Sequence, residues 1–527
     1  MDKDPSLTKQ DRLSAQLQGP CSSLRLVNIE ARVGEVALIE EAKEWALNLM
    51  ELAYTNLKPY RKLKMLVNPV GGSGQGLKLF HTKIKPILEA AGCTLDVTLT
   101  THVNHGVEVV RALPLDQGID AIVCVSGDGM VHEVLNGLAT REDAHEAMKI
   151  PVAPIPAGSG NAVAVNLLGP AQGFNLALAC LNVIKGQAIF MDVCTITQPA
   201  DSRDGSTVQP FNRATTKTKK RPSSATSSTA EAASPNLISE SPALPYTLSY
   251  TFLSQAIGLM ADIDLGTEDM RALGDTRFIL GYIGGILANK ECEIDVYVKL
   301  GKRGTTNKRE MRRRVEEANK AGPRDKAIEE EETQSPTSLR NGAVTDPLPN
   351  ADEIPILDLR DPSWQSHLVG TDEDGEHQAT DPSKWYRIAA PIAALYGGKI
   401  PYVARDLMSF PYAYPGDSCV DFVFQLMSGG RKTFIKAIQD GGSGTHVYNP
   451  AMVYLKVDAY RIVPRLEEGS KKLRKGGLIS IDGEHRPYRS FQVEVHQSLH
   501  FRVLSLYGRF CVPVVTAPAN TEANAAS

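Results

Sequence analysis

The chain has 527 residues, of which 42% are hydrophobic and 22% are charged, so it is long enough to form two or more domains with a sizeable core. Its formal net charge of −4 argues against wholesale binding of nucleic acid. The eight cysteines show no C-x-x-C spacing, so we expect no zinc framework and a cytoplasmic setting. The first residues are polar and no apolar run reaches about 18 residues, so we expect neither a secretory signal nor a membrane-spanning helix.

Residues 1–60 are expected to form an N-terminal extension with one helix. Apolar side chains recur with helical spacing between residues 36 and 54, and we expect this helix to pack on the domain that follows. The alternative is a helix that lies on a membrane surface, but the polar face of such helices is normally basic, whereas this one is rich in glutamate.

Residues 61–195 alternate between strand and helix patterns. Strands are expected at 65–67, 95–99, 119–125 and 152–155, and helices at 77–91, 107–113, 131–139 and from 162 onward. This alternation predicts an open α/β sheet whose ligand site lies at the carboxyl ends of the strands.

Two long stretches interrupt the regular patterns. Residues 198–244 are rich in Ser, Thr, Ala and Pro, with a basic cluster at 217–221, and residues 303–384 contain Arg312–Arg314 followed by an acidic run at 329–332. Both are predicted to be disordered insertions, either simply solvated or carrying phosphorylation sites or contacts with anionic lipid.

The segments between and after these insertions are rich in strand patterns. Strands are expected at 246–254, 292–300, 419–427, 451–461, 477–481, 490–496 and 501–505. They predict a second, mainly antiparallel domain over 196–512, followed by a disordered tail at 513–527.

Three glycine-rich segments follow successive predicted strands: Asn68–Gly76, Ser126–Gly129 and Gly158–Asn161. Glycine lets the backbone approach a phosphate closely, and the N–H groups at the start of a helix favour anions. The first segment lacks the Gly-Lys-Ser/Thr ending of a P-loop. Three such segments within about 100 residues nevertheless predict a phosphate-handling enzyme.

Asp128 lies at a predicted strand-to-helix turn and has three candidate roles. It could hold a metal ion, accept a proton from an attacking hydroxyl, or cap the helix that follows. Glu133 and Asn136 on that helix could brace the turn.

Two further segments contain charged residues that could have a functional or a structural role. Residues 258–277 contain several acids, followed by Arg271 and Arg277. The acids could recognise a cationic or hydroxylated substrate, and the two arginines could bind phosphate. The alternative is a helix with internal charge pairs. Asp482-Gly483 between two predicted strands is typical of a hairpin turn.

Together these segments closely resemble the sphingosine kinase (sphingoid long-chain base kinase) family, within the diacylglycerol-kinase catalytic-domain superfamily, and the insertions are similar to those of fungal members. The resemblance is carried by Asn68-Pro69 with Gly71-Gly72, Ser126-Gly127-Asp128-Gly129 with His132-Glu133-Val134 and Asn136-Gly137, Pro156–Ala162, Ala261–Asp264 with Arg271 and Arg277, and Asp482-Gly483-Glu484. The Asp-Gly core is shared with diacylglycerol, ceramide and NAD kinases, whereas the Asp262/Asp264 segment narrows the resemblance to sphingoid bases.

The resemblance implies an N-terminal nucleotide-binding α/β domain, a C-terminal β-sandwich domain with a lipid pocket, and chemistry in the cleft between them. It implies ATP and Mg²⁺ as cofactors and transfer of phosphate to the primary hydroxyl of sphingosine, dihydrosphingosine or phytosphingosine. It further implies peripheral association with an intracellular or plasma membrane, and a homodimer is left open.

The resemblance also implies roles for individual residues. Asp128 would be the general base, and the lipid would contact Asp264, Ser254 and His446. The nucleotide and its phosphates would contact Asn68, Gly71, Gly72, Thr100, Ser126, Gly127, Gly129, Gly158, Ser159, Arg271, Arg277, Asp482 and Glu484. The last two would lie near magnesium.

Some family members carry basic residues in the first glycine-rich segment, where this chain has Val70, Ser73 and Gln75. Phosphate binding would therefore depend more on Arg271 and Arg277. The rival hypotheses are a diacylglycerol or ceramide kinase, an NAD kinase, and a non-catalytic lipid-binding protein on the same fold.

Overall fold

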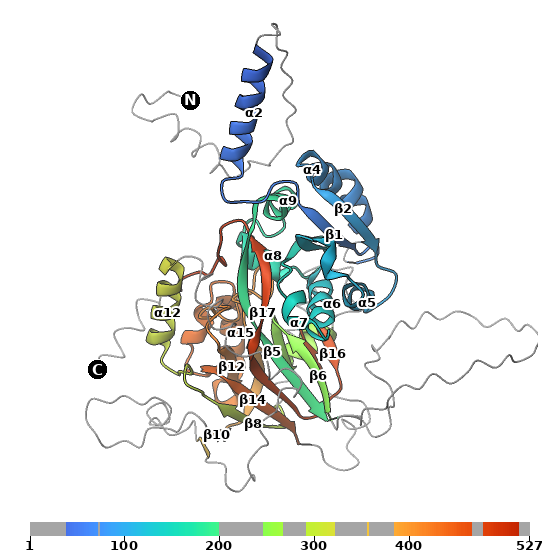
Figure 1. The fold of residues 1–527 in the computed structure, drawn as a ribbon. Coiled ribbons are helices and arrows are strands. Elements are labelled where there is room, and N and C mark those ends of the chain that lie inside the picture. The colour runs from blue at the N-terminus through green and yellow to red at the C-terminus, as the bar shows by residue number, and fades with distance from the viewer. Residues whose placement is uncertain are drawn as a thin grey trace, which may run out of the picture.

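The computed structural model describes residues 38–71, 74–199, 246–266, 291–321, 356–357, 384–465 and 478–515 (Figure 1). Gly72, Arg271 and Arg277 lie outside the described residues, and so do residues 200–244 of the first insertion and the side chain of Asp264. The predictions for these positions stay predictions.

The N-terminal domain has a parallel sheet with the strand order β2-β1-β3-β4, which confirms the predicted α/β class. Its strands are β1 (Lys62–Val67), β2 (Thr94–Leu99), β3 (Ala121–Ser126) and β4 (Val152–Pro156). The connecting helices are α3 (Gly76–Leu79), η2 (Phe80–Ile84), α4 (Lys85–Ala90), α5 (His105–Arg111), η3 (Leu115–Gln117), α6 (Asp128–Ala139), α7 (Ala144–Ala147), α8 (Ala162–Leu168) and α9 (Leu176–Lys185). The carboxyl ends of the four strands meet at one edge, where the glycine-rich segments follow.

The predicted helix over 77–91 is one helical run with a π-helical turn, η2, in its middle. This turn comes directly before Pro86 in α4, and proline lacks the N–H that a regular helical hydrogen bond requires.

The parallel sheet continues into the C-terminal half, because β17 (Phe491–Ser505) pairs with β4 through Val503 and Val152. The resulting sheet, sheet A, has 11 strands. Beyond β17 follow β14 (Ala459–Pro464), β8 (Ile294–Lys299), β10 (Trp385–Ile388) and β9 (Ile356–Leu357), while β5 (Gln187–Pro199) pairs with β17 and β6 (Tyr246–Thr251) pairs with β5. Strands from both predicted domains therefore belong to one sheet.

A second sheet, sheet B, has six strands that are all antiparallel to their neighbours. Their order is β13 (Met452–Val457), β12 (Val420–Leu426), β11 (Ile392–Gly398), β7 (Ser254–Gly258), β15 (Ile479–Ile481) and β16 (Glu484–Arg486). The helical segments that the structure describes in this half are α10 (Leu259–Gly266), α12 (Lys308–Ala321), η6 (Met427–Gly429), α15 (Gly430–Gly441) and η7 (Thr445–Tyr448).

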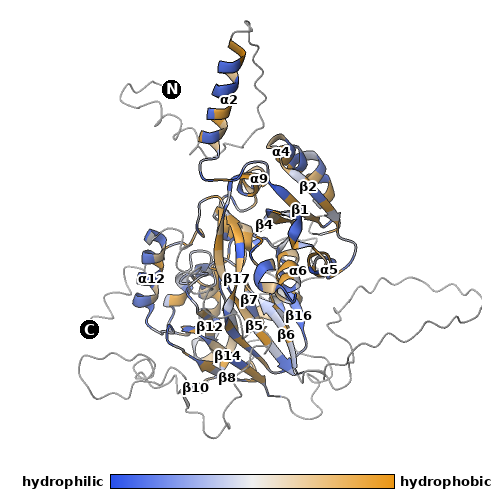
Figure 2. Cartoon of the chain, viewed as in Figure 1, coloured by the Kyte–Doolittle hydropathy of each residue, from blue (hydrophilic) through white to orange (hydrophobic). Residues whose placement is uncertain are grey.

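Apolar side chains from both sheets form one buried core, so the C-terminal half is a β-sandwich. Figure 2 colours hydrophobic residues of the strands in this half orange. Val296 and Ile462 of sheet A belong to the same cluster as Phe422 and Leu455 of sheet B. Alternate residues of each strand supply this core, as in sandwiches generally. The implied β-sandwich is thereby confirmed.

Two predictions are wrong, one about the packing of the N-terminal helix and one about the second insertion. The N-terminal helix α2 (Ile39–Ala53) forms, but none of its residues is buried, and Trp45 is 66% and Leu52 76% exposed. Helical spacing predicts an apolar face, but it does not say what covers that face. No helix among the described residues is both long and apolar enough to cross a membrane.

The second insertion, predicted to be disordered from residue 303, contains a helix, α12 (Lys308–Ala321). Met311 and Val315 are buried on one side of it, and Arg313 forms ion pairs with Glu310 and Glu317. The charged composition suggested a solvated loop because only a few apolar residues, at helical spacing, mark the buried face. Val515, in the predicted disordered tail, is also buried.

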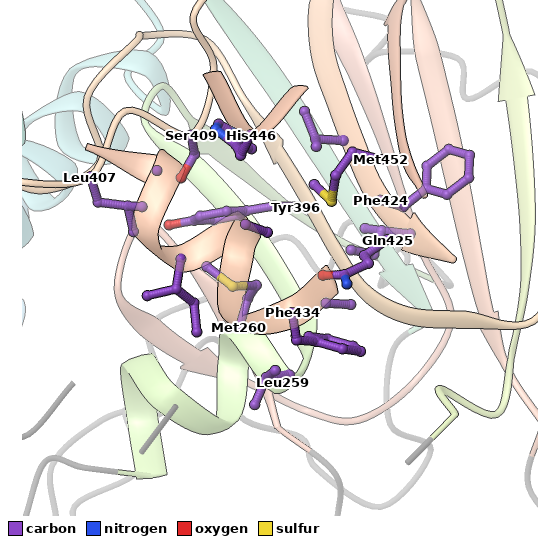
Figure 3. Close-up of a pocket in the computed structure, with 16 residues that line it drawn as sticks. Leu259, Met260, Tyr396, Leu407, Ser409, Phe424, Gln425, Phe434, His446 and Met452 are labelled. Carbon is purple, nitrogen blue, oxygen red and sulfur yellow. The ribbon is translucent and has the colours of Figure 1, made fainter. Parts of the chain in front are cut away.

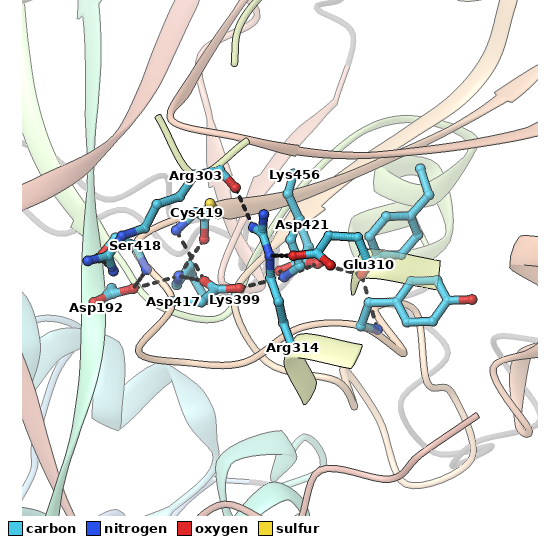
Figure 4. A network of polar contacts seen from close by, with 12 residues as sticks. Asp192, Arg303, Glu310, Arg314, Lys399, Asp417, Ser418, Cys419, Asp421 and Lys456 are labelled. Carbon is cyan, nitrogen blue, oxygen red and sulfur yellow. Dashed lines mark hydrogen bonds and ion pairs between the residues drawn. The ribbon is translucent and has the colours of Figure 1, made fainter. Parts of the chain in front are cut away.

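Two lysines of the β-sandwich are completely buried among three aspartates (Figure 4). Lys399 Nζ lies 2.8 Å from Asp192 and 3.1 Å from Asp417, and Lys456 Nζ lies 2.5 Å from Asp417 and 2.9 Å from Asp421. Burial alone would lower the pKa of both lysines, but the aspartates raise it above the usual value. This buried ion network joins β5 of sheet A to β12 and β13 of sheet B.

Replacing Lys399 with Met should strongly destabilise the protein, because it leaves buried carboxylates without their cation. We expect the free energy of unfolding to fall by about 3–5 kcal/mol. Lys436→Met is the control, since Lys436 pairs with Asp440 at an exposed site and its loss should cost less than about 1 kcal/mol. Urea denaturation followed by circular dichroism measures both, and equal midpoints for the two variants would contradict the expectation.

Candidate functional site

The second and third glycine-rich segments pack backbone to backbone. The N–H of Asp128 donates to the carbonyl of Gly160 at 3.1 Å, and the N–H of Ala157 donates to that of Ser126 at 3.1 Å. A Cβ on Gly127 would lie 2.6 Å from the Gly160 oxygen, and a Cβ on Gly158 would lie 2.4 Å from the Gly127 Cα. Larger residues would therefore force these two loops apart.

The first glycine-rich segment lies beside them at the end of β1. The N–H of Asn68 donates to the carbonyl of Val125, and the Asn68 side-chain oxygen accepts hydrogen bonds from the N–H groups of Val70 and Gly71 at 3.1 and 2.9 Å. Thr100 is buried at the end of β2, and its N–H donates to Val67. The structure thus brings the described nucleotide-binding candidates of all three segments to one edge of the sheet.

Asp128 is the first residue of α6 and is only 7% exposed. Its carboxylate accepts hydrogen bonds from the N–H of Ala162 at 2.7 Å and of Val163 at 3.1 Å, so it caps α8 and not its own helix. Burial raises the pKa of Asp128 to about 6, although these two N–H groups lower it, and the charge of Asp482 adds to the rise. Each carboxylate oxygen has a further lone pair, so Asp128 can still accept a proton.

Asp482 and Gly483 form the predicted hairpin turn between β15 and β16, with φ of +51° and +85°. The Asp482 carboxylate is buried within the protein. Five groups donate hydrogen bonds to it: His132 Nδ1 at 2.8 Å, Thr251 Oγ1 at 2.6 Å, and the N–H groups of Phe252, Leu253 and Ser254 at 3.2, 3.0 and 2.9 Å.

Burial would raise the pKa of Asp482, but the hydrogen bond and charge of His132, together with the other donors, hold it below its usual value. These bonds fix α6 of the N-terminal domain to the turn between β6 and β7. With its oxygens taken by protein donors, Asp482 is suited to positioning the site, whereas the family resemblance implies a place near phosphate and magnesium.

Glu484 is the exposed acid of the same turn, and it reaches the start of α6. A Cβ on Gly129 would lie 3.1 Å from Glu484 Oε1, so this carboxylate faces the second glycine-rich segment. Among the residues described, no group of three or more acids, histidines or cysteines could hold a metal ion by itself. Mg²⁺ in kinases is commonly held by one or two carboxylates together with phosphate oxygens, and Glu484 fits that role.

Glu133 and Asn136 brace the site from α6, as the sequence suggests. Glu133 accepts hydrogen bonds from the N–H groups of Asn104 and Gly106 at the start of α5. Asn136 bonds both the N–H and the carbonyl of Tyr250 on β6, each at 2.9 Å. The helix that begins with Asp128 is therefore held by both domains.

A mostly apolar pocket lies between sheet B, α10, α15 and η7 and has a volume of about 580 Å³, including space open to solvent (Figure 3). Its wall includes Leu259, Met260, Phe424, Phe434, Met452 and His446, the last of which the resemblance implies as a lipid contact. Tyr396 also lines the pocket, and its hydroxyl donates to Ser254 Oγ at 3.3 Å. The N–H of Ser254 bonds Asp482, and Asp482 bonds His132, so a short chain of hydrogen bonds connects the pocket to the helix that begins with Asp128.

Three residues near the site were not assigned a role from the sequence: His132, Tyr396 and Gln425. His132 follows Asp128 by four positions and so shares its helix face, which is a usable signal. Tyr396 and Gln425 belong to strands whose pocket-facing side cannot be recognised before the sheet register is known.

Comparisons with known proteins show what the chain is similar to. The family model of the diacylglycerol kinase catalytic domain matches residues 62–196. Sphingoid long chain base kinase 5 from Saccharomyces cerevisiae is 29% identical over 478 residues, covering 87% of this chain and 61% of that protein. Sphingoid long chain base kinase 4 from Schizosaccharomyces pombe is 25% identical over 466 residues, covering 88% of this chain and 79% of that protein.

A crystal structure of a diacylglycerol kinase from Bacillus anthracis aligns with a TM-score of 0.42 and 15% identity, over 85% of this chain and 97% of that one. The chain spans less than two thirds of the first relative's length. Residues 62–196 thus match the model of the diacylglycerol kinase catalytic domain, and most of the chain is similar to sphingoid long-chain base kinases.

Proposed function

We propose that the protein is an ATP-dependent kinase that phosphorylates the primary hydroxyl of a sphingoid long-chain base to give its 1-phosphate. The observation that carries this proposal is the position of Asp128. Its buried carboxylate lies where the second and third glycine-rich segments meet. Hydrogen bonds that run from His132 on the same helix through Asp482 and Ser254 to Tyr396 connect this helix to the apolar pocket.

Phosphoryl transfer depends mainly on positioning and on neutralising charge. The N–H groups of the glycine-rich loops would bind phosphate oxygens, and Glu484 would hold Mg²⁺ together with them. Bound Mg²⁺ would supply positive charge at the phosphates. Asp128 would accept the proton of the substrate hydroxyl, because a carboxyl with a pKa of about 6 is ionised at neutral pH and is a stronger base than an ordinary aspartate.

The pocket would hold the hydrocarbon tail of the substrate. Helix α10 begins with Leu259 and Met260, which line the pocket, and Asp264 belongs to the same helix. A carboxylate there would favour the amine of a sphingoid base over a neutral diacylglycerol. Since the substrate resides in a bilayer, we also propose that the protein works at the cytoplasmic side of a membrane as a peripheral protein.

A panel of substrates tests the function. Purified protein with ATP and Mg²⁺ should transfer labelled phosphate to sphingosine, dihydrosphingosine or phytosphingosine, and much less to ceramide or diacylglycerol. Faster phosphorylation of ceramide or diacylglycerol than of every sphingoid base would overturn the assignment, and so would the absence of transfer to any lipid.

Asp128→Asn should reduce kcat by about 10²–10⁴-fold, the usual contribution of a general base. The amide keeps the size of the side chain but cannot accept the proton. ATP binding measured by calorimetry, and the melting temperature, serve as controls for the cap on α8. Turnover within a factor of two of the wild type would show that Asp128 is not the base.

The rate should depend on pH through the same carboxyl. Because Asp128 must be ionised and its pKa is about 6, we expect kcat/KM to be level near neutral pH and to fall about tenfold per pH unit below 6. Circular dichroism at each pH checks that the protein stays folded. A rate that stays constant down to pH 5 would contradict the assignment.

Replacing Asp482 with Asn should affect stability, whereas replacing Glu484 with Gln should affect the dependence on Mg²⁺. Asp482→Asn should lower the free energy of unfolding by about 3 kcal/mol, since an NH₂ group would face buried donors. Glu484→Gln should leave the melting temperature nearly unchanged and raise the Mg²⁺ concentration needed for half-maximal activity. Thermal unfolding and a Mg²⁺ titration measure these effects, and the reverse pattern would exchange the two roles.

A further inference from the structure

Asn166 of α8 is fully buried and connects the two halves of the molecule. Its Nδ2 donates a hydrogen bond to the carbonyl of Ala162, one turn earlier in the same helix, at 2.8 Å, and another to the carbonyl of Tyr402 at 2.7 Å. Its Oδ1 accepts a hydrogen bond from the N–H of Tyr402 at 3.1 Å. The backbone carbonyl of Asn166 also accepts one from the N–H of Cys511 at 2.7 Å. Two segments of the C-terminal half are therefore bound to α8 at this residue.

The other end of α8 holds the carboxylate of Asp128. The first two residues of the helix, Ala162 and Val163, donate their N–H groups to this carboxylate at 2.7 and 3.1 Å. The helix has only seven residues, and Asn166 bonds the Ala162 carbonyl directly. Because so short a helix moves as a rigid unit, a shift of Asn166 would carry both N–H donors with it.

Tyr402 begins a segment that forms part of the pocket wall. This segment closes on itself, since the N–H of Val403 donates to the carbonyl of Leu407 at 3.1 Å. Leu407 and Ser409 line the pocket, and Figure 3 shows both on the same side of the cavity. The amide of α8 that bonds both backbone groups of Tyr402 therefore links the pocket wall to this helix.

We propose that Asn166 is a positioning residue for phosphoryl transfer: it fixes α8 against the pocket wall and thereby holds the carboxylate of Asp128 in place. The inference rests on the proposed function, in which Asp128 is the general base. Because Asn166 is fully buried, it acts through Asp128 and not by contact with the substrate. The wall that receives the lipid and the group that removes its proton are in this way positioned by one side chain.

Replacing Asn166 with Ala tests this role. The variant loses both hydrogen bonds to Tyr402, so α8 is no longer fixed against the pocket wall. We expect kcat to fall at least about tenfold, since a small misplacement of a catalytic group is costly. The N–H groups of α8 lower the pKa of Asp128, so their displacement should raise it, and the acidic limb of kcat/KM should move from about pH 6 to higher pH.

The titratable groups around both residues leave this readout clear. Burial raises the pKa of Tyr402 and of Cys511, so both side chains are neutral near pH 6. On the other side, the charge of Asp482 raises the pKa of Asp128, and Glu484 faces the neighbouring glycine of α6. The substitution changes neither of these two acids.

Asn182 offers a matched control. It is also a buried asparagine on a helix of the N-terminal domain, α9, and its Nδ2 donates to the carbonyl of Leu504 on β17 at 2.8 Å. The hydrogen bonds to Asp128 come from α8 and not from α9. Asn182→Ala should therefore also lower the melting temperature, but it should keep kcat within a factor of two and leave the acidic limb unmoved.

A second variant covers the case in which Asn166→Ala does not fold. Asn166→Ser keeps a hydroxyl that can bond the Ala162 carbonyl of its own helix but removes the amide that bonds Tyr402. It should show the same fall in kcat and the same movement of the acidic limb. Circular dichroism checks that each variant is folded.

The outcomes separate this inference from the function itself. Values of kcat and an acidic limb that match those of Asn182→Ala would overturn the role of Asn166 and leave the kinase assignment standing. If the wild type phosphorylates no sphingoid base, the proposed function fails. The Asp128 carboxyl can then be titrated by carbon-13 NMR, with its signal assigned by Asp128→Asn. A higher midpoint in the Asn166 variant than in the wild type would support the positioning role, and an equal midpoint would overturn it.

Discussion

The carboxylate of Asp482 joins the two halves of the molecule. It accepts a hydrogen bond from His132 on the helix that begins with Asp128, and it accepts hydrogen bonds from three backbone N–H groups in the turn that leads into β7. A buried carboxylate tolerates few geometries, because each unfilled lone pair would cost free energy. The helix that begins with Asp128 and residue Ser254, whose Oγ accepts a hydrogen bond from the pocket residue Tyr396, are consequently positioned by the same two oxygens.

One face of sheet B changes from charged to apolar within a few residues. In the sheet register, Ser254, Gly398, Asp421 and Lys456 form one row across four strands, and Asp421 and Lys456 belong to the buried ion network. Two residues further along each strand, the row contains Tyr396 and Val423. In the proposed function, the lipid tail would lie against the apolar end of this face.

The α/β alternation, the glycine-rich edge and the strands of the sandwich were predicted well, because local periodicity and glycine spacing indicate these features directly. It failed where a residue's role depends on a distant partner. His132 and Asp482 are 350 positions apart, so the filled carboxylate of Asp482 could not be foreseen from a hairpin signature. The helix α12 and the exposed face of α2 were missed for a related reason, since what an apolar side chain packs against is set by the tertiary fold.

The pairing of β17 with β4 has a consequence for how the chain acquires its structure. Phe501 and Val503 belong to the same buried cluster as Val123, Ile155 and other residues of the first domain. During synthesis, β4 leaves the ribosome long before β17 is made. This edge of the sheet therefore stays unpaired while more than half of the polypeptide is synthesised. A fragment cut after residue 199 would keep that edge bare and would tend to aggregate, even though it carries every glycine-rich loop.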